Sequence, residues 1–267
     1  MTMATNDLHP SPPAAPPRGR IIAVTSGKGG VGKTFISANL AAALTRRGKR
    51  VLVLDADLGL ANLDVVLNLM PKITLHDVFT GKAQLDDAIV PAPGGFSVLL
   101  AGSGMVEYSR LTPEVREQLL RVIETVAPRF DCILLDTGAG ISDVVLYAVS
   151  LADEVLVVAT SEPTSMTDAY ATIKVLAAQQ KRSLIQLVVN QVSRAGEGRS
   201  IRSQLQLVVD RFVNPGAAKP LKLELLGEIP ADPAVREAVQ RRHLLLEAYP
   251  GSAAAMGVNA VAARLAP

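Results

Sequence analysis

A glycine-rich stretch with two lysines constrains this chain more than any other feature of its sequence. Residues 27–34 read GKGGVGKT, which matches the phosphate-binding pattern G-x-x-x-x-G-K-T and adds a lysine at its second position. The apolar run at 21–24 predicts a buried strand before the loop, and Ile36, Leu40 and Leu44 predict a helix after it. A strand, a glycine-rich loop and a helix in this order predict an α/β fold that binds a nucleoside triphosphate.

Each part of this loop has an expected role at the triphosphate. The glycines allow successive backbone N–H groups to point at phosphate oxygens, and the start of the helix adds partial positive charge. Lys33 is expected to reach the β- and γ-phosphates, and the Thr34 hydroxyl is expected to ligate Mg²⁺. The predicted nucleotide-binding residues of the loop are Gly27, Lys28, Gly29, Gly30, Val31, Gly32, Lys33, Thr34 and Phe35.

Composition limits the classes of protein that fit. The chain is 49% hydrophobic but only 3% aromatic, so we expect a large core of aliphatic side chains. A net charge of +2 gives no strong bias toward nucleic acid or anionic membranes. The single cysteine, Cys132, is expected to be a buried strand thiol, which excludes intrachain disulfides and fits a reducing cytoplasm. The sequence shows neither an apolar signal core nor an apolar span of membrane length.

The order of apolar and helix-like segments predicts the architecture. Residues 1–19 are rich in proline and are expected to form a disordered leader. Residues 20–250 alternate strands that are apolar on both faces with helices, which predicts a doubly wound, mostly parallel sheet flanked by helices on both faces. The predicted strands are 20–26, 50–55, 96–101, 131–136, 154–160, 184–190 and 223–229. The predicted helices are 33–47, 113–127, 142–151, 164–180, 200–213 and 233–248.

Acidic side chains follow two of the predicted strands. The second strand ends at Asp55, with Asp57 two residues later, and another ends at Asp136 before a glycine-rich turn. Ligands of parallel sheets sit at the carboxyl ends of the strands, so these carboxylates are expected near the triphosphate. There they would hold Mg²⁺, partly through water, or orient the attacking water. The predicted metal-binding set is Thr34, Asp55, Asp57 and Asp136.

The sequence favours adenine over guanine as the base. A guanine site usually needs an Asn/Thr-Lys-x-Asp run at a late strand end, and this chain reads NQVS from Asn190. Asn190 and the segment from Ile229 through Pro230 to Asp232 are the candidate contacts to the base. For Pro230 and Asp232, a plain turn from strand to helix explains the residues equally well.

Taken together, these motifs resemble those of a known family. GKGGVGKT at 27–34, DADLGLANLD at 55–64 and LLDTGAG at 134–140 are similar to the MinD/ParA group of deviant Walker ATPases, which are P-loop NTPases of the SIMIBI class. The resemblance covers roughly residues 20–250. Further stretches resemble the FlhG/FleN type, the MinD-like regulators of flagellar number and placement. They are SEPTSMTDAYATIKVL at 161–176, LVVNQV at 187–192 and GEIPADPAVREAVQRRHLLLEAYP at 227–250.

The resemblance implies a switch that dimerises on ATP and hydrolyses it to ADP and phosphate. In this group ATP is held between two subunits, and the early lysine, here Lys28, reaches the partner's phosphates and neutralises charge in the transition state. A second lysine on the rim of the loop does not easily share the phosphate cradle with Lys33. The expected catalytic residues are therefore Lys28, Lys33 and Asp57. Asp57 would position the hydrolytic water, Asp55 would support the metal, and Asn62 would lie near the nucleotide.

Two positions depart from the family pattern. Phe35 stands where relatives commonly carry a small hydroxyl residue. The hydrogen bond lost near the α-phosphate is worth about 0.5–1.5 kcal/mol, so ATP binding is expected to survive. The leader also lacks the Asp-Gln-Ala motif with which flagellar relatives stimulate a signal-recognition-type GTPase partner. Activation of such a partner by this segment is therefore not expected.

The tail at 251–267 has two expected arrangements. Relatives dock on membranes through an amphipathic C-terminal helix. Here Arg264 is the only cation of the tail, so we expect either a weak membrane contact, strengthened in an ATP dimer, or a helix packed on its own domain. The apolar side chains that would serve either arrangement are Met256, Val258, Val261 and Leu265.

The resemblance also implies partners, a location and competing functions. The partners are a second copy, the flagellar GTPase FlhF, switch or C-ring proteins or a flagellar transcription regulator, with no specific nucleic acid. The location is cytoplasmic, and peripheral on the cell membrane when ATP is bound. The alternatives are MinD-like positioning of division and a ParA-like partition ATPase, whose DNA contacts would be Arg194, Arg199, Arg202 and Arg211. Iron–sulfur and tyrosine-kinase functions lack paired cysteines and a tyrosine-rich tail, and no second substrate pocket is evident for a ligase.

Overall fold

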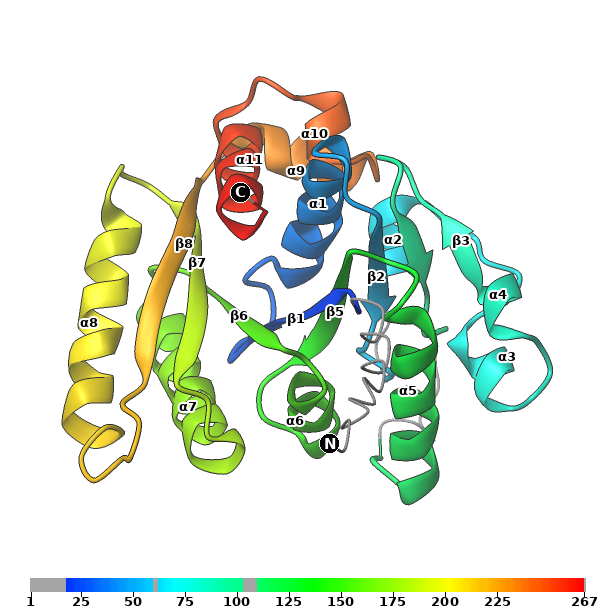
Figure 1. Cartoon of the computed structure of the whole chain (residues 1–267). Helices are drawn as coiled ribbons and strands as arrows, with labels where there is room; N and C mark the ends of the chain where they lie inside the picture. Colours follow the sequence, from blue (N-terminus) through cyan, green and yellow to red (C-terminus); the bar gives the residue numbers. More distant parts are fainter. Residues whose placement is uncertain (1–17, 60–61, 103–109, 267) are drawn as a thin grey trace, which may run out of the picture.

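One twisted sheet forms the centre of the molecule (Figure 1). The computed structural model describes residues 18–59, 62–102 and 110–266. Within these residues the sheet has eight strands in the order β3-β4-β2-β5-β1-β6-β7-β8, and only the β3–β4 pair is antiparallel. The strands are β1 Arg20–Ser26, β2 Val51–Asp55, β3 Ile89–Pro91, β4 Ser97–Leu99, β5 Cys132–Ala139, β6 Glu154–Ala159, β7 Leu184–Val192 and β8 Lys222–Pro230. The predicted fold class is confirmed.

Helices cover both faces of this sheet (Figure 1). Helices α5 to α8 lie along one face, and α1 and α9 to α11 lie along the other. The longer helices are α1 Lys33–Arg46, α5 Pro113–Val126, α6 Asp143–Ser150, α7 Pro163–Gln180, α8 Glu197–Phe212, α9 Pro233–Gln240 and α11 Ala253–Leu265. The short ones are α2 Leu63–Leu67, α3 Leu75–Phe79, α4 Leu85–Ala88 and α10 Leu245–Ala248.

The alternation of side chains along the strands creates two aliphatic cores. In β1, Ile21 and Ala23 join the core under α5 to α8, whereas Ile22 and Val24 join the core under α1 and α11. Successive strand residues point to opposite faces, so a strand buried on both sides must be apolar throughout. Cys132 is buried at the start of β5, as predicted, and burial raises the pKa of its thiol to about 12.

Local capping explains several helix starts. Thr112 caps α5 by accepting a hydrogen bond from the Val115 N–H, with Pro113 at the first helical position, as predicted.

The predicted single helix at 233–248 is wrong, because the chain breaks after α9 at Arg242, whose φ of 54° is left-handed. The predicted strand at 96–101 is shorter, α8 begins at Glu197 before the predicted 200, and β3 and the short helices α2 to α4 were not predicted.

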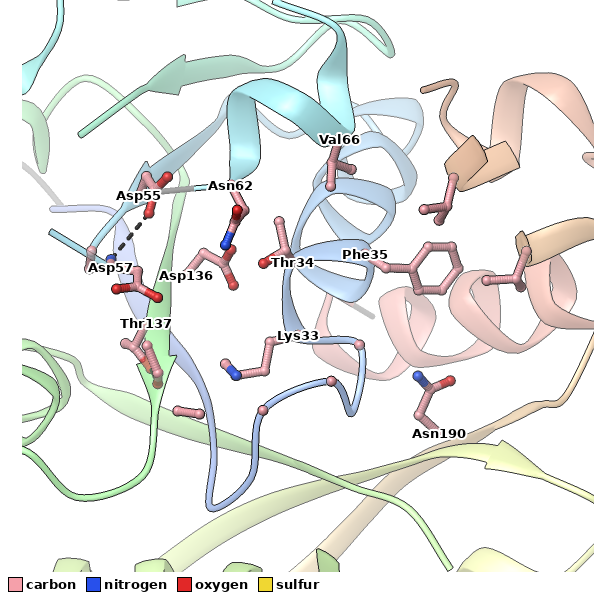
Figure 2. A pocket seen from close by; sticks show the side chains of 18 of the residues that line it. Lys33, Thr34, Phe35, Asp55, Asp57, Asn62, Val66, Asp136, Thr137 and Asn190 are labelled. Carbon is pink, nitrogen blue, oxygen red and sulfur yellow. Dashed lines mark hydrogen bonds between the residues drawn. The ribbon is translucent and has the colours of Figure 1, made fainter. Parts of the chain in front are cut away.

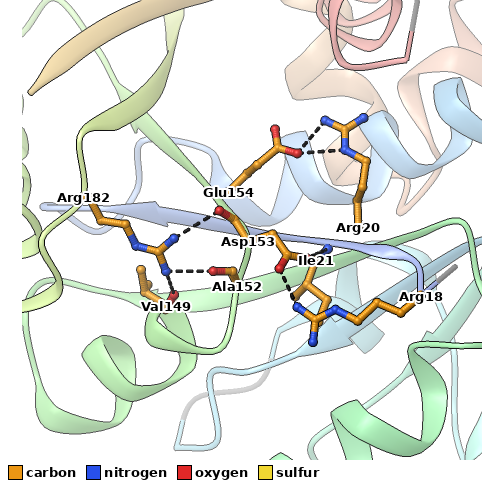
Figure 3. A network of polar contacts seen from close by, with 8 residues as sticks. All are labelled: Arg18, Arg20, Ile21, Val149, Ala152, Asp153, Glu154 and Arg182. Atoms are coloured by element: carbon orange, nitrogen blue, oxygen red, sulfur yellow. Dashed lines mark hydrogen bonds and ion pairs between the residues drawn. The ribbon is translucent and has the colours of Figure 1, made fainter. Parts of the chain in front are cut away.

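Ion pairs fix the point at which the chain enters β1 (Figure 3). Asp153, just before β6, pairs with Arg18 and accepts a hydrogen bond from the Ile21 N–H at 2.9 Å. Arg20 pairs with Glu154 at 2.7 Å. A third arginine, Arg182, donates hydrogen bonds to backbone carbonyl oxygens at the end of α6 and in the connection to β6, those of Val149, Ala152 and Asp153. Residues 1–17 of the predicted leader lie outside the described residues.

The C-terminal helix packs on its own domain, which is one of the two arrangements expected for the tail. Val258, Val261 and Leu265 are buried in the core formed with β8 and α1, whereas Met256 is 61% exposed. Arg20 and Arg47 donate hydrogen bonds to the backbone carbonyls of Leu265 and Ala266, at the last turn. Among the described residues, no helix has the length and apolar character needed to cross a membrane.

Truncation of Leu265 tests whether α11 is part of the core. Leu265→Ala should lower the free energy of unfolding by about 2–5 kcal/mol, because Leu265 is only 2% exposed and its removal leaves a cavity. Met256→Ala on the same helix is the matched control and should change it by less than about 0.5 kcal/mol. Urea titration of both variants measures the difference. Equal, small effects would show that α11 contributes little to the core.

Candidate nucleotide-binding site

A cavity of about 980 Å³ opens at the carboxyl ends of the central strands. Its walls come from the loops after β1, β2 and β5, the end of β7, and helices α1 and α9. This volume is in the range of sites that bury a small ligand. Most predicted site residues line it: Gly29, Gly30, Gly32, Lys33, Thr34, Phe35, Asp55, Asp57, Asp136, Asn190, Pro230 and Asp232. Gly27, Lys28, Val31 and Ile229 lie beside it instead, and Val31 and Ile229 are buried in the core.

The loop between β1 and α1 needs its glycines for shape and for space. Gly30 and Gly32 have φ values of 79° and 98°, which L side chains rarely adopt. A Cβ on Gly27 would lie 2.1 Å from the carbonyl oxygen of Asp168 in α7, and one on Gly32 would lie 2.4 Å from Nδ2 of Asn190. The loop is therefore held closely between α7 and β7. At Gly27 and Gly32 a side chain would collide with these neighbours and displace the loop.

Lys33 lies at the start of α1 and points into the cavity (Figure 2). Its side chain is nearly buried, and Nζ donates a hydrogen bond to Oγ of Ser26 at 2.9 Å. Burial lowers the pKa of Lys33, and the charges of Asp136 and Asp57 oppose that shift. The positive charge of Lys33 is thus buried and only partly balanced by carboxylates. At a helix N-terminus such a charge favours the binding of an anion, as expected of a phosphate-binding lysine.

Asp55, at the end of β2, lies beside Asp136 of β5, which continues to Ala139 past its predicted end at 136. Burial raises the pKa of Asp136 to about 6, although hydrogen bonds from Thr34 and Ser37 and the charge of Lys33 lower it. Burial, and next the charge of Asp136, raise the pKa of Asp55 well above its ordinary value. Two adjacent buried carboxylates with raised pKa values mark a place where a cation would be stabilised.

The residues present fit a Mg²⁺ ion bound together with phosphates. Oδ2 of Asp55 is buried and accepts no hydrogen bond within the described part of the chain, while Oδ1 accepts one from the Asp57 N–H at 3.1 Å. The Thr34 hydroxyl lines the same cavity. Among the residues that the structure places, no group of three Asp, Glu, His or Cys side chains forms a complete metal cage. Mg²⁺ usually takes one or two protein ligands and completes its shell with phosphates and water.

Asp136→Asn should stabilise the nucleotide-free protein above pH 6. A carboxylate whose pKa rises on folding binds its proton more tightly in the folded state, so stability is lost as pH rises through that pKa. A shift from 3.8 to about 6 corresponds to roughly 3 kcal/mol of lost stability above pH 6. Urea titrations without Mg²⁺ at pH 4.5 and pH 8 measure the free energy of unfolding of both proteins. The variant should be more stable relative to the wild type at pH 8 than at pH 4.5. A difference that does not change with pH would contradict this assignment.

Lys28 lies on the outer side of the loop and is held by the start of α7. Its Nζ donates to Oε2 of Glu162 at 2.8 Å and to Oγ1 of Thr164 at 3.0 Å. The side chain is 38% exposed and does not line the cavity that contains Lys33. The two lysines of the loop therefore face different environments, one inside the subunit's own cavity and the other at its surface.

The predicted base contacts have defined structural roles. Nδ2 of Asn190 donates to the carbonyl oxygen of Val31 at 2.8 Å, which ties β7 to the phosphate-binding loop. Asp232 caps α9, because its carboxylate accepts a hydrogen bond from the backbone N–H of Ala234, and it also accepts one from the N–H of Ala254 in the first turn of α11. For Asp232 the structure thus shows the strand-to-helix turn that the sequence also allowed. Pro230 lines the cavity just before that turn.

Sequence reasoning missed the contribution of α9 and α2 to the cavity wall. Val235 and Val239, one helical turn apart on α9, line the cavity with Arg236 and Gln240. Val66 on α2 lines it from another side. The spacing of Val235 and Val239 gives α9 an apolar face that was visible in the sequence. The structure was needed to show that this face meets the cavity.

Comparisons with known proteins agree with this geometry. Residues 22–245 match the family model of the CobQ/CobB/MinD/ParA nucleotide binding domain. The antiactivator FleN of Pseudomonas aeruginosa is 43% identical, covering 92% of this chain and 86% of its own. The flagellum site-determining protein YlxH of Helicobacter pylori is 33% identical, covering 92% and 81%. The septum site-determining protein MinD of Pyrococcus horikoshii, solved with Mg-ADP, superimposes with a TM-score of 0.76 at 29% identity, covering 93% and 96%.

The fold, the glycine-rich loop and the buried carboxylates define a P-loop nucleotide hydrolase. This chain belongs to the CobQ/CobB/MinD/ParA family of nucleotide-binding domains, and within it resembles the MinD-type flagellar regulators. It is an ATPase, with ATP as its nucleotide and Mg²⁺ as its metal ion.

Proposed function

We propose that this protein is an ATP-dependent dimerising switch that regulates the number or placement of flagella. Two relatives that match more than nine-tenths of this chain are named as a flagellar antiactivator and a flagellum site-determining protein. ATP binding joins two copies, and hydrolysis to ADP and phosphate lets them separate. The signal is the lifetime of the dimer, so a slow ATPase suits this role.

The position of Lys28 is the observation that carries this proposal. Lys28 is outside its own cavity, exposed, and bound by Glu162 and Thr164 at the rim. A second subunit placed against this rim would bring its γ-phosphate within reach of a cation that the first subunit does not use for itself. Forming the dimer then exchanges an exposed ion pair, worth at most about 1 kcal/mol, for a contact with a phosphate.

The other polar residues of the cavity bind the phosphates, bind the metal ion or position water. Lys33 and the backbone of the loop hold the phosphates, and Thr34 with Asp55 and Asp136 holds Mg²⁺ directly or through water. Asp57 positions the attacking water. A Cβ on Gly138 would lie 3.3 Å from the Asp57 carboxylate, so the last residues of β5 lie directly beside it. This end of β5 and the turn that follows it are therefore placed to respond when the γ-phosphate leaves.

Partners and location follow from the same switch. The ATP dimer would present a composite surface to a flagellar transcription activator, a switch protein or the flagellar GTPase FlhF. We place the protein in the cytoplasm, with membrane contact only if α11 leaves its core position, since its buried apolar residues are not available otherwise. Residues 1–17, where a GTPase-activating motif would lie, are outside the described part of the chain.

The partition alternative is less well supported by the structure. Its DNA contacts would require the arginines of α8 and the loop before it to act together. Instead, Nε of Arg202 donates to the carbonyl oxygen of Leu223 in β8, and Arg211 lies over the Phe212 ring at 5.2 Å. Arg202 is thus engaged within its own subunit, which makes it less suited to contact DNA phosphates.

Counting flagella in cells tests the proposal. Cells that lack the protein should show an altered number or position of flagella, and the wild-type gene should restore the normal pattern. The Lys28→Ala variant should not restore it, whereas Lys219→Ala, on the loop that leads into the start of β8, should. Normal flagella together with misplaced division septa, or with loss of DNA segregation, would contradict the flagellar role.

A further inference from the structure

The cavity has two chemically different ends (Figure 2). Lys33, Thr34, Asp55, Asp57 and Asp136 gather at one end, where charge and hydrogen-bonding groups suit phosphates and Mg²⁺. The ring of Phe35 points away from this end, toward the side of the cavity where α9 lies. Apolar side chains from three helices line the second end: Phe35 of α1, Val66 of α2, and Val235 and Val239 of α9.

Phe35 is an unusual side chain for the first turn after a phosphate-binding loop. It is 7% exposed and lines the cavity. A small hydroxyl residue here would contribute one hydrogen bond to a phosphate oxygen, whereas phenylalanine contributes only its backbone N–H. Its ring is mostly packed in the core, and the part left uncovered borders the cavity at the end away from the phosphates.

We propose that Phe35 is a specificity-determining residue that provides a stacking surface for the nucleobase, in an apolar slot completed by Val66, Val235 and Val239. The four side chains of the slot are apolar and give a phosphate chain nothing to bind, although Arg236 and Gln240 of α9 also line the cavity. A flat heteroaromatic base can use this end, since every base has a face that stacks on an aromatic ring. The chain thereby draws part of its nucleotide affinity from the base, in place of a contact to the α-phosphate.

Binding of ADP compared with binding of pyrophosphate tests this proposal. Both ligands carry a diphosphate, but only ADP has a base, and neither supports hydrolysis. Isothermal titration with Mg²⁺ should give Phe35→Leu an affinity for ADP that is about tenfold weaker than wild type, because the apolar volume stays while the ring is lost. The affinity of this variant for pyrophosphate should be unchanged.

A second pair of variants removes the question of folding. Val239→Ala should weaken the affinity for ADP by about threefold to tenfold and leave the affinity for pyrophosphate unchanged. Val239 is 45% exposed, so its truncation does not threaten the core. Val65→Ala is the matched control, because Val65 is 48% exposed and does not line the cavity. It should change neither affinity.

Two results would overturn the proposal. One is an equal loss of ADP and pyrophosphate affinity in the Phe35→Leu and Val239→Ala variants, which would make these residues supports of the phosphate loop. The other is unchanged ADP affinity in both variants. The proposal rests on nucleotide binding at this cavity and not on dimerisation, so ADP titrations on single subunits remain decisive even if the dimer switch proves wrong.

Discussion

Replacing Lys28 by alanine should abolish ATP hydrolysis and ATP-induced dimers while one subunit still binds ATP. The side chain contributes nothing to its own cavity, so monomer affinity should change little. A cation supplied in trans to a transferring phosphoryl group is worth about 10³–10⁵ in kcat, and a loss of that order is expected here. Isothermal titration measures binding, light scattering measures mass, and phosphate release measures turnover.

Lys219→Ala is the control for this variant. It removes an exposed lysine from the loop that leads into the start of β8, outside the cavity, and should leave binding, dimerisation and turnover as in the wild type. Normal turnover by the Lys28→Ala protein would show that the exposed lysine has no catalytic role. Loss of ATP binding by the single subunit would place Lys28 in its own site and contradict the geometry seen here.

Replacing Asp57 by alanine should have the opposite effect on assembly. Asp57 lines the cavity beside the last residues of β5, in a position to orient water. Without it, hydrolysis should fall by about 10²–10⁴, as for loss of a positioned proton acceptor. ATP should still bind and still join two subunits, so the dimer should persist for as long as ATP is supplied.

Size-exclusion chromatography with ATP and Mg²⁺ distinguishes the two variants. The Asp57→Ala protein should elute as a dimer after incubation times at which the wild type has returned to monomer. Asp87→Ala, which removes an exposed carboxylate on α4, should behave as the wild type. A monomeric Asp57→Ala protein would mean that this carboxylate is needed for assembly and not for cleavage.

Local patterns in the sequence were sufficient to predict the fold and most of the cavity. The glycine-rich loop, the apolar strands and the acidic strand ends depend on short stretches of chain and on the rule that parallel strands carry ligands at their carboxyl ends. Asp55 and Asp136 are adjacent in the sheet, as predicted, although β5 continues to Ala139 and does not end at 136. The roles of the individual site residues remain predictions.

The missed features depend on contacts between segments distant in sequence. The helix breaks at Arg242, which has a left-handed backbone conformation, and no proline or glycine at this position indicates the break in the sequence. The apolar face of α9 can be assigned to the cavity only in the folded chain, where Phe35 and Val66 line the same cavity. The short elements β3 and α2 to α4 have too few residues to show a hydrophobic period, so the sequence pattern could not predict them.

Mixing the two inactive variants tests the central claim most directly. If Lys28 acts on the partner's ATP, a dimer of one Lys28→Ala and one Asp57→Ala subunit contains one complete site. That site has the loop and Asp57 of the first subunit and Lys28 of the second. The mixture should then regain ATP hydrolysis that neither variant shows alone. No recovery, with mixed dimers demonstrated by differently tagged subunits, would show that Lys28 does not act across the interface.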